Sequence, residues 1–248
     1  MKKVYFFLLI LFFTKSTYAI EFQGKFIQGH FIIGKTEPDT KVLIDKKEVR
    51  ISDDGYFVFG ISRDRKYDVV ITLNKYGSKQ KIVKKVLKRK YDIQRIDGLP
   101  EEQVTPPEEV YERIKKENKL IGDAKTVNSN LTYFKNKFIV PIKNTIITGV
   151  YGSQRILNGE PKWPHYGLDF AADEGTKIKA MLDGTVTLAE SDLYYTGGTL
   201  IFDHGHGIST LYMHMQKIFV KKGQKIKQGD IIGTVGSTGR ATGAHLDV

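Results

Sequence analysis

The feature that most constrains the fold is the alternation of short apolar runs with glycine from Phe138 onward. Residues 199–203 and 231–235 have the length and composition of β-strands. Four similar runs lie at 146–150, 177–181, 184–188 and 209–214. The glycines between these runs permit backbone angles that other residues resist. We therefore expect a compact, β-rich domain with tight corners at 136–248.

A second set of short runs occupies residues 20–97. The expected strands lie at 26–27, 31–33, 42–44, 56–59 and 69–73, and Asp-Gly and Tyr-Gly pairs mark turns between some of them. The simplest assembly is an immunoglobulin-like β-sandwich. Only His30 of the six histidines lies here, and no other reactive group accompanies it, so we expect a non-catalytic module.

The connector at 98–135 has a helical rather than a strand-like sequence pattern. Thr105, two prolines and Glu108 resemble a capped helix start, and Val110, Ile114 and Ile121 would then share one face. We expect one amphipathic helix that ends near Gly122 and sets the two β-rich parts against each other. The fold class is thus mainly β with a linking helix.

Cysteine is absent from all 248 residues. This excludes disulfide scaffolds, thiolate zinc fingers, iron–sulfur clusters and cysteine nucleophiles. Any metal site must use nitrogen and oxygen ligands. With 40% hydrophobic residues the chain can still bury a real core, which argues against a wholly disordered protein.

The first 19 residues have the pattern of an export signal. A basic start precedes an apolar run at 4–13, and small residues at Thr17 and Ala19 precede the expected cleavage. A membrane anchor is the alternative, but the run is about half of the ~20 residues needed to span a bilayer. We expect an exported protein of the periplasm or cell envelope, with no integral membrane span in its mature form.

The formal net charge is +11, and loss of Lys2, Lys3 and Lys15 with the signal would lower it by three. Many of the remaining cations crowd between Lys75 and Lys90. Such a cluster could favour anionic polymers such as cell wall, or a membrane surface, but we prefer the simpler explanation of a solvated strand face. A nucleic-acid partner is not expected, because export would separate the protein from nucleic acid and the sequence contains no nucleic-acid-binding motif.

Histidines and carboxylates concentrate in the last domain. His165 and Asp169 are four residues apart, and His245 and Asp247 are two apart, so each pair returns to one face of an extended strand. His214 stands between the two pairs. A catalytic zinc needs about three protein ligands and an open position. The order of these groups in a glycine-rich β-domain indicates such a site.

These segments resemble the lysostaphin-type (LytM, M23) zinc metallopeptidases, which cut peptide bonds in peptidoglycan. Residues 165–169 match the family's H-x-x-x-D motif, residues 211–214 its isolated histidine, and residues 222–239 its glycine-rich run. Residues 242–247, Thr-Gly-Ala-His-Leu-Asp, stand where the family has T-G-x-H-L-H. The resemblance covers Phe138 to Val248 and implies a peptidoglycan endopeptidase with one Zn²⁺ per catalytic domain.

The resemblance also implies roles for individual residues. His165 and Asp169 would bind zinc, and His214 and His245 would flank it as the catalytic pair. Asp247 replaces the histidine that is normally the third ligand, and we expect its carboxylate to take that place. A site with one imidazole and two carboxylates would retain zinc less firmly, or would accept a harder metal such as manganese.

Two functions follow as hypotheses. The first is hydrolysis of peptidoglycan peptide cross-links by metal-activated water. The alternative is a catalytically degenerate LytM-like module that regulates cell-wall amidases, for which Asp247 is the only argument. The N-terminal module could contact a cell-wall or envelope protein. Because family members usually continue past the final motif, we also expect the sequence to be a fragment, truncated at its C-terminal end.

Overall fold

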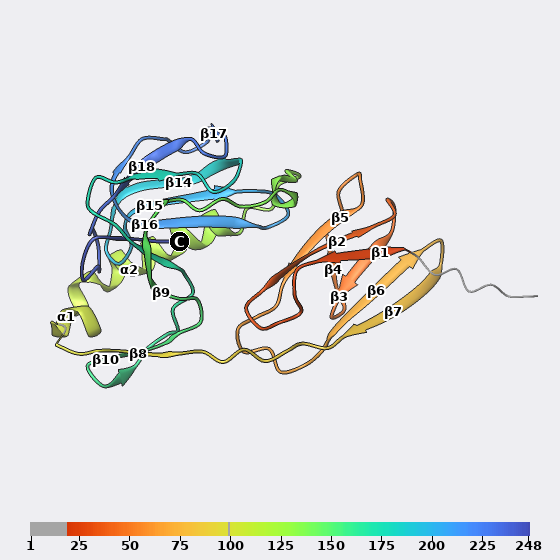
Figure 1. The fold of residues 1–248 in the computed structure, drawn as a ribbon, viewed down its shortest axis with the longest axis horizontal. Coiled ribbons are helices and arrows are strands. Elements are labelled where there is room, and N and C mark those ends of the chain that lie inside the picture. Colours follow the sequence, from red (N-terminus) through yellow and green to blue (C-terminus); the bar gives the residue numbers. More distant parts are fainter. Residues whose placement is uncertain (1–18, 99) are drawn as a thin grey trace, which may run out of the picture.

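The computed structural model describes residues 19–98 and 100–248, so the predicted signal peptide lies outside the described residues except for Ala19. Strands dominate, and they form two bodies joined by an extended and partly helical connector (Figure 1). Among the helices of the described residues, none is both long enough and apolar enough to cross a membrane. The predicted domain boundaries stay a prediction.

The N-terminal body consists of two antiparallel sheets. One has the order β1 (Ile20–Gln23), β2 (Phe31–Thr36), β5 (Tyr56–Gly60). The other has the order β4 (Lys47–Val49), β3 (Lys41–Ile44), β6 (Val69–Lys75), β7 (Ser78–Lys84). The two sheets enclose one apolar core, because alternate residues of each strand point inward. Its members include Ile32, Val42, Phe57, Phe59, Ile71 and Leu73.

Four of the five strands predicted for this body are confirmed with small shifts at their ends. The fifth, at 26–27, is wrong, since Ile27 forms only an isolated bridge to Leu87. The immunoglobulin-like classification stays a prediction.

The C-terminal body is built on a long antiparallel path of strands. They are β9 (Ile146–Gly149), β12 (Asp169–Ala171), β13 (Lys177–Lys179), β14 (Gly184–Leu193), β15 (Gly197–Asp203), β16 (Ser209–Ile218), β17 (Lys225–Ile226), β18 (Ile231–Val235) and β19 (His245–Asp247). The main order is β17-β14-β15-β16-β19-β12-β9, and β18 pairs with both β13 and β16. All six predicted strands of this part are present. The core between them is centred on Leu200, Phe202, Tyr212 and Ile232.

The helices differ from the prediction at their starts. A short α1 (Glu101–Val104) and a 3₁₀ turn η1 (Glu108–Val110) precede α2 (Tyr111–Lys125). Thr105 lies at the end of α1, and α2 begins after Val110 without a side-chain cap, so the predicted capping box is wrong. Ile121 and Ala124 of α2 pack against Leu188 and Ile201 of β14 and β15. The helix therefore fixes the connector to the C-terminal body.

The segment just before the predicted connector contributes a strand to the C-terminal body. Strand β8 (Ile93–Ile96) pairs in parallel with β10 (Gln154–Leu157), which forms a hairpin with β11 (Glu160–Pro161). Gln94 lies opposite Arg155 in this register, and Ile96 lies opposite Leu157. Figure 1 shows this small sheet at the edge of the C-terminal body, where the connector passes.

Two contacts fix the N-terminal body against the C-terminal one. Phe134, in the 3₁₀ turn η2 (Tyr133–Lys135), is fully buried among Ile33, Val58 and Ile208. Ile33 and Val58 belong to strands β2 and β5 of the N-terminal body, and Ile208 belongs to the C-terminal body. On the other side, the Arg63 Nε donates a hydrogen bond of 2.7 Å to the Gly152 carbonyl.

Candidate metal centre

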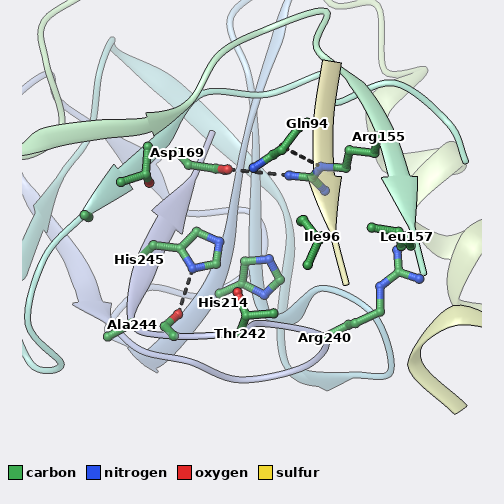
Figure 2. Close-up of a pocket in the computed structure, with 13 residues that line it drawn as sticks. Gln94, Ile96, Arg155, Leu157, Asp169, His214, Arg240, Thr242, Ala244 and His245 are labelled. Atoms are coloured by element: carbon green, nitrogen blue, oxygen red, sulfur yellow. Dashed lines mark hydrogen bonds and ion pairs between the residues drawn. The ribbon is translucent and has the colours of Figure 1, made fainter. Parts of the chain in front are cut away.

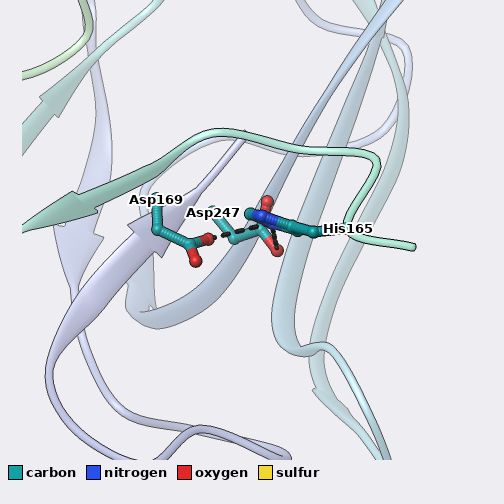
Figure 3. Close-up of side chains that lie close together, drawn as sticks. All are labelled: His165, Asp169 and Asp247. Carbon is teal, nitrogen blue, oxygen red and sulfur yellow. Dashed lines mark hydrogen bonds and ion pairs between the residues drawn. The ribbon is translucent and has the colours of Figure 1, made fainter. Parts of the chain in front are cut away.

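Three buried side chains predicted as metal ligands converge in the C-terminal body (Figure 3). Asp169 and Asp247 lie directly opposite each other in the antiparallel pair β12–β19, and His165 comes from the loop before β12. The His165 Nε2 lies 3.1 Å from the Asp169 Oδ1 and 3.2 Å from the Asp247 Oδ2. One ligand atom from each residue lies within 4.8 Å of the others. All three are at most 6% exposed, so water does not substitute freely for a ligand there.

The hydrogen-bonding pattern of the three residues fits a cation. The Asp169 Oδ1 and the Asp247 Oδ1 are buried and have no hydrogen-bond partner. Although the Asp169 Oδ1 is close to the His165 Nε2, the geometry of that contact is not that of a hydrogen bond. Buried carboxylate oxygens without partners are costly, and a divalent cation would satisfy them. The donor set of one imidazole and two carboxylates suits zinc.

Two glycines make room for the ligands. A Cβ atom on Gly167 would collide with the Asp247 Oδ1 and lie 3.1 Å from the His165 Nε2. A Cβ atom on Gly149 of β9 would collide with the Asp169 Oδ2. The backbone therefore approaches the ligand atoms more closely than any other residue type allows at these two positions.

The electrostatics of the three residues are those of a cation site. Burial alone lowers the pKa of His165, but the Asp169 and Asp247 carboxylates beside its Nε2 outweigh burial and raise this pKa to about 9. For Asp169, burial raises the pKa, and His165, His245 and Arg155 together outweigh burial and lower it. The two carboxylates beside the ring thus favour a positive charge on the imidazole, in the place where a metal ion would supply it.

The predicted catalytic histidines lie side by side next to these ligands. The ring centroids of His214 and His245 are 4.7 Å apart. The His214 Nδ1 lies 2.8 Å from the Thr238 carbonyl, and the His245 Nδ1 lies 2.8 Å from the Gly243 carbonyl. A carbonyl oxygen only accepts, so each Nδ1 carries the proton and each Nε2 is left as an acceptor. Burial also lowers the pKa of His214, which favours its neutral form.

His214 holds an unusual backbone conformation. Its φ is +61°, in the left-handed region, although it lies inside strand β16. The register of the neighbouring strands shifts around this point, and the His214 N–H donates to the Thr196 carbonyl at 2.8 Å. Such bulges re-aim a side chain at the expense of regular pairing. The strand is thus distorted where its histidine reaches the cavity.

A cavity of about 290 Å³ connects the two groups of residues (Figure 2). Asp169, His214 and His245 line it, whereas His165 and Asp247 do not. Sequence reasoning missed the other polar lining residues, Gln94, Thr148, Arg155, Arg240 and Thr242. Thr242 is part of the quoted motif and Thr148 lies in a predicted strand, but no motif marks Gln94, Arg155 or Arg240, which come from separate segments.

The pair His204 and His206 does not form a second site. The His204 ring lies 2.6 Å from the Asp183 carbonyl and 2.9 Å from the Thr210 hydroxyl, so both ring nitrogens are used. Among the described residues, His165, Asp169 and Asp247 form the one group arranged to hold a metal. Residues 206–207 form a turn between β15 and β16 instead.

Residues 163–248 match the model of Peptidase family M23, and this domain contains all five predicted site residues. Residues 163–248 thus form a domain similar to peptidase family M23. Its relatives include peptidoglycan DD-endopeptidase ShyA of Vibrio cholerae, 45% identical over 83 residues. They also include the DD-carboxypeptidase/endopeptidase Mpg of Neisseria meningitidis, 40% identical over 82 residues.

The sequence matches cover about a third of this chain, whereas one structural match covers most of it. The match to ShyA covers 34% of this chain and 19% of that protein, and the match to Mpg covers 33% and 19%. A Pseudomonas aeruginosa structure described as a candidate M23 peptidase aligns with 90% of this chain and 89% of its own, at 26% identity and a TM-score of 0.67. The likeness therefore extends through the N-terminal body and the connector.

Proposed function

We propose that this protein is an exported zinc metalloendopeptidase that hydrolyses peptide cross-links of bacterial peptidoglycan. The observation that carries the proposal is the convergence of three buried ligands and a histidine pair on one cavity in an M23 domain. The names of the relatives support peptidoglycan as the substrate. Export to the periplasm or envelope rests on the sequence of residues 1–19 and on the location of that substrate.

His165, Asp169 and Asp247 would hold the metal, with Asp247 in the role that a histidine has in most of the family. A bound zinc ion supplies Lewis acidity, which acidifies water and polarises a peptide carbonyl. Two carboxylates and one neutral imidazole balance the charge of a divalent ion. This neutral site makes the water less acidic than a histidine-rich site would, and it also suits manganese.

The histidine pair would move the proton. Each Nε2 is an acceptor because each Nδ1 donates to a backbone carbonyl. One Nε2 takes the proton from the attacking water, and the other, once protonated, donates to the oxygen that develops negative charge. The carbonyl partners, on Thr238 and Gly243, hold both rings in the tautomer that this exchange needs.

The second candidate function is a binding module that regulates cell-wall amidases without catalysis. Asp247 carries it, because it departs from the family pattern at a ligand position. Asp247 is buried opposite Asp169, and one of its carboxylate oxygens has no hydrogen-bond partner. This environment favours Asp247 as a metal ligand over the loss of the ligand at this position. We further propose that the N-terminal body, of immunoglobulin-like type, contacts a cell-wall or envelope protein.

The test is mass spectrometry of the muropeptides that the purified protein releases from sacculi, after chelation and again after added Zn²⁺. We expect zinc-dependent loss of cross-linked peptides. The matched control is the His214→Ala variant, which should bind one zinc by elemental analysis but leave cross-links intact. A wild-type protein that binds zinc and cleaves nothing would refute the enzyme and support the amidase partner. One that binds no metal would refute the site itself.

A further inference from the structure

The two oxygens of the Asp169 carboxylate have different surroundings. The Oδ1 lies 3.1 Å from the His165 Nε2 and is one of the buried oxygens without a hydrogen-bond partner. The Oδ2 accepts a hydrogen bond from the Arg155 Nη2 at 3.5 Å. One oxygen of this candidate ligand thus lies beside another candidate ligand, and the other lies beside a guanidinium.

Arg155 belongs to β10 and reaches Asp169 from outside the catalytic motifs (Figure 2). Its Nε donates a hydrogen bond to the Gln94 Oε1 at 3.4 Å, and Gln94 lies directly opposite it on β8. Both side chains line the cavity. A guanidinium is planar, so contacts to its Nε and its Nη2 together fix its orientation. Gln94, Arg155 and Asp169 therefore form a continuous chain of hydrogen bonds that ends at a candidate metal ligand.

Strand β8 also determines where the backbone of Arg155 lies. In its sheet, β10 has two neighbours, β8 and the two-residue strand β11. A hairpin of two short strands is marginally stable by itself, so pairing with β8 keeps β10 in place. The same strand thus places the backbone of Arg155 and, through Gln94, orients its side chain.

A ligating aspartate needs this kind of support because its last torsion is poorly defined. The χ2 angle of aspartate has broad minima, so rotation of Asp169 would exchange the oxygen that lies beside His165. Replacing a group that hydrogen-bonds a metal ligand typically lowers metal affinity about 10- to 100-fold. The charge of Arg155 acts in the opposite direction, because it repels a metal cation. The Arg155 side chain is 28% exposed, so solvent screens this repulsion, and we expect orientation to be the larger effect.

We propose that Gln94 and Arg155 are positioning residues for the candidate metal ligand Asp169. Gln94 orients the Arg155 guanidinium, and Arg155 holds the Asp169 Oδ2 so that the Oδ1 stays beside His165. This inference rests on the metal centre of the proposed function. It gives the segment before the connector a part in building that centre, through a side chain as well as through strand pairing.

The experiment is a double-mutant cycle on the zinc affinity of the full chain, measured by chelator competition. Arg155→Gln should weaken zinc binding about 10-fold, at the low end because both hydrogen bonds are long. Gln94→Met keeps the length of the side chain without its acceptor, and it should weaken binding about 3-fold. The double variant should bind zinc as Arg155→Gln does, because Gln94 acts only through Arg155.

Arg95→Gln is the matched control for the loss of charge. Arg95 lies between Gln94 and Ile96 on β8, is exposed, and does not line the cavity. Its replacement should leave zinc affinity within about 2-fold of wild type. The visible absorption of the Co²⁺-loaded protein, which reports ligand geometry, should change in Arg155→Gln and Gln94→Met but not in Arg95→Gln. Arg155→Lys keeps the charge without the planar fork and should recover only part of the lost affinity.

Several results would overturn the positioning role. They are a zinc affinity that Arg155→Gln leaves unchanged or raises, additive effects of Arg155→Gln and Gln94→Met, full recovery in Arg155→Lys, and an equal loss in Arg95→Gln. None of these measurements needs a substrate. Coupled zinc affinities in a protein that cleaves no peptidoglycan would support the inference and refute the proposed function. Additive affinities in a protein that cleaves cross-links would do the reverse, and a wild-type protein that binds no zinc would overturn both.

Discussion

Replacement of Phe134 by alanine should uncouple the two bodies of the protein. The ring is fully buried between Ile33 and Val58 on one side and Ile208 on the other, and it lies 4.8 Å from the His206 ring. A buried phenylalanine removes about 150–250 Å² from water, worth about 4–6 kcal/mol at ~25 cal/mol per Å². Measured Phe→Ala losses of about 3–5 kcal/mol agree with this range. Other contacts remain, including Lys135 to Asp54 at 2.7 Å, so we expect a loss of about 3–4 kcal/mol in coupling.

The assay is calorimetric and denaturant unfolding of the variant beside Phe219→Ala. Phe219 is 53% exposed, and its removal should cost less than about 0.5 kcal/mol. For Phe134→Ala we expect the thermal transition to broaden or split into two, while zinc binding is kept because the metal ligands lie elsewhere. A single transition within about 1 kcal/mol of the Phe219→Ala protein would refute the argument that this ring joins the bodies.

Three further outcomes are expected. Asp247→Ala should weaken zinc binding by at least about 100-fold in a chelator competition assay, and Asp247→His should strengthen it relative to wild type. Unchanged zinc affinity in the alanine variant would show that Asp247 is no ligand. Gly167→Ala should lower zinc affinity without unfolding the protein, because its Cβ would displace the Asp247 carboxylate; full zinc affinity with an unchanged fold by circular dichroism would contradict the close approach. Burial lowers the pKa of His204 below its ordinary 6.5. The unfolded chain therefore binds a proton at this residue more readily than the folded chain does, and the free energy of unfolding should fall as the pH drops below about 6.5. Urea titrations from pH 8 to pH 5 should therefore show wild type losing stability relative to His204→Gln, and parallel curves would refute this.

The cluster of candidate metal ligands could be predicted from the sequence because its residues come in short motifs. His245 and Asp247 lie two residues apart on one strand, and Asp169 opens the strand that pairs with it. Local spacing thus fixes which side chains face together. The roles of these residues remain a prediction, but the structure brings all of them to one place.

The cavity wall could not be predicted, for a physical reason. Strands β8 and β10 are four residues each and pair in parallel across a long stretch of sequence, so neither has a local pattern that predicts its partner. The start of α2 was predicted wrongly for a different reason. Thr105 satisfies the rule for a helix cap, but the chain uses it to end α1, and tertiary packing on β14 and β15 decides where α2 lies.

The parallel strand β8 has a consequence for recombination between related enzymes. Both β8 and β10 lie ahead of residues 163–248, the segment that matches the M23 family. A chimera that inherits only that segment would receive the candidate metal ligands and both histidines, but it would take the side of the cavity formed by β8 and β10 from its new host. The candidate metal site and this side of its cavity are therefore encoded in separately exchangeable parts of the gene.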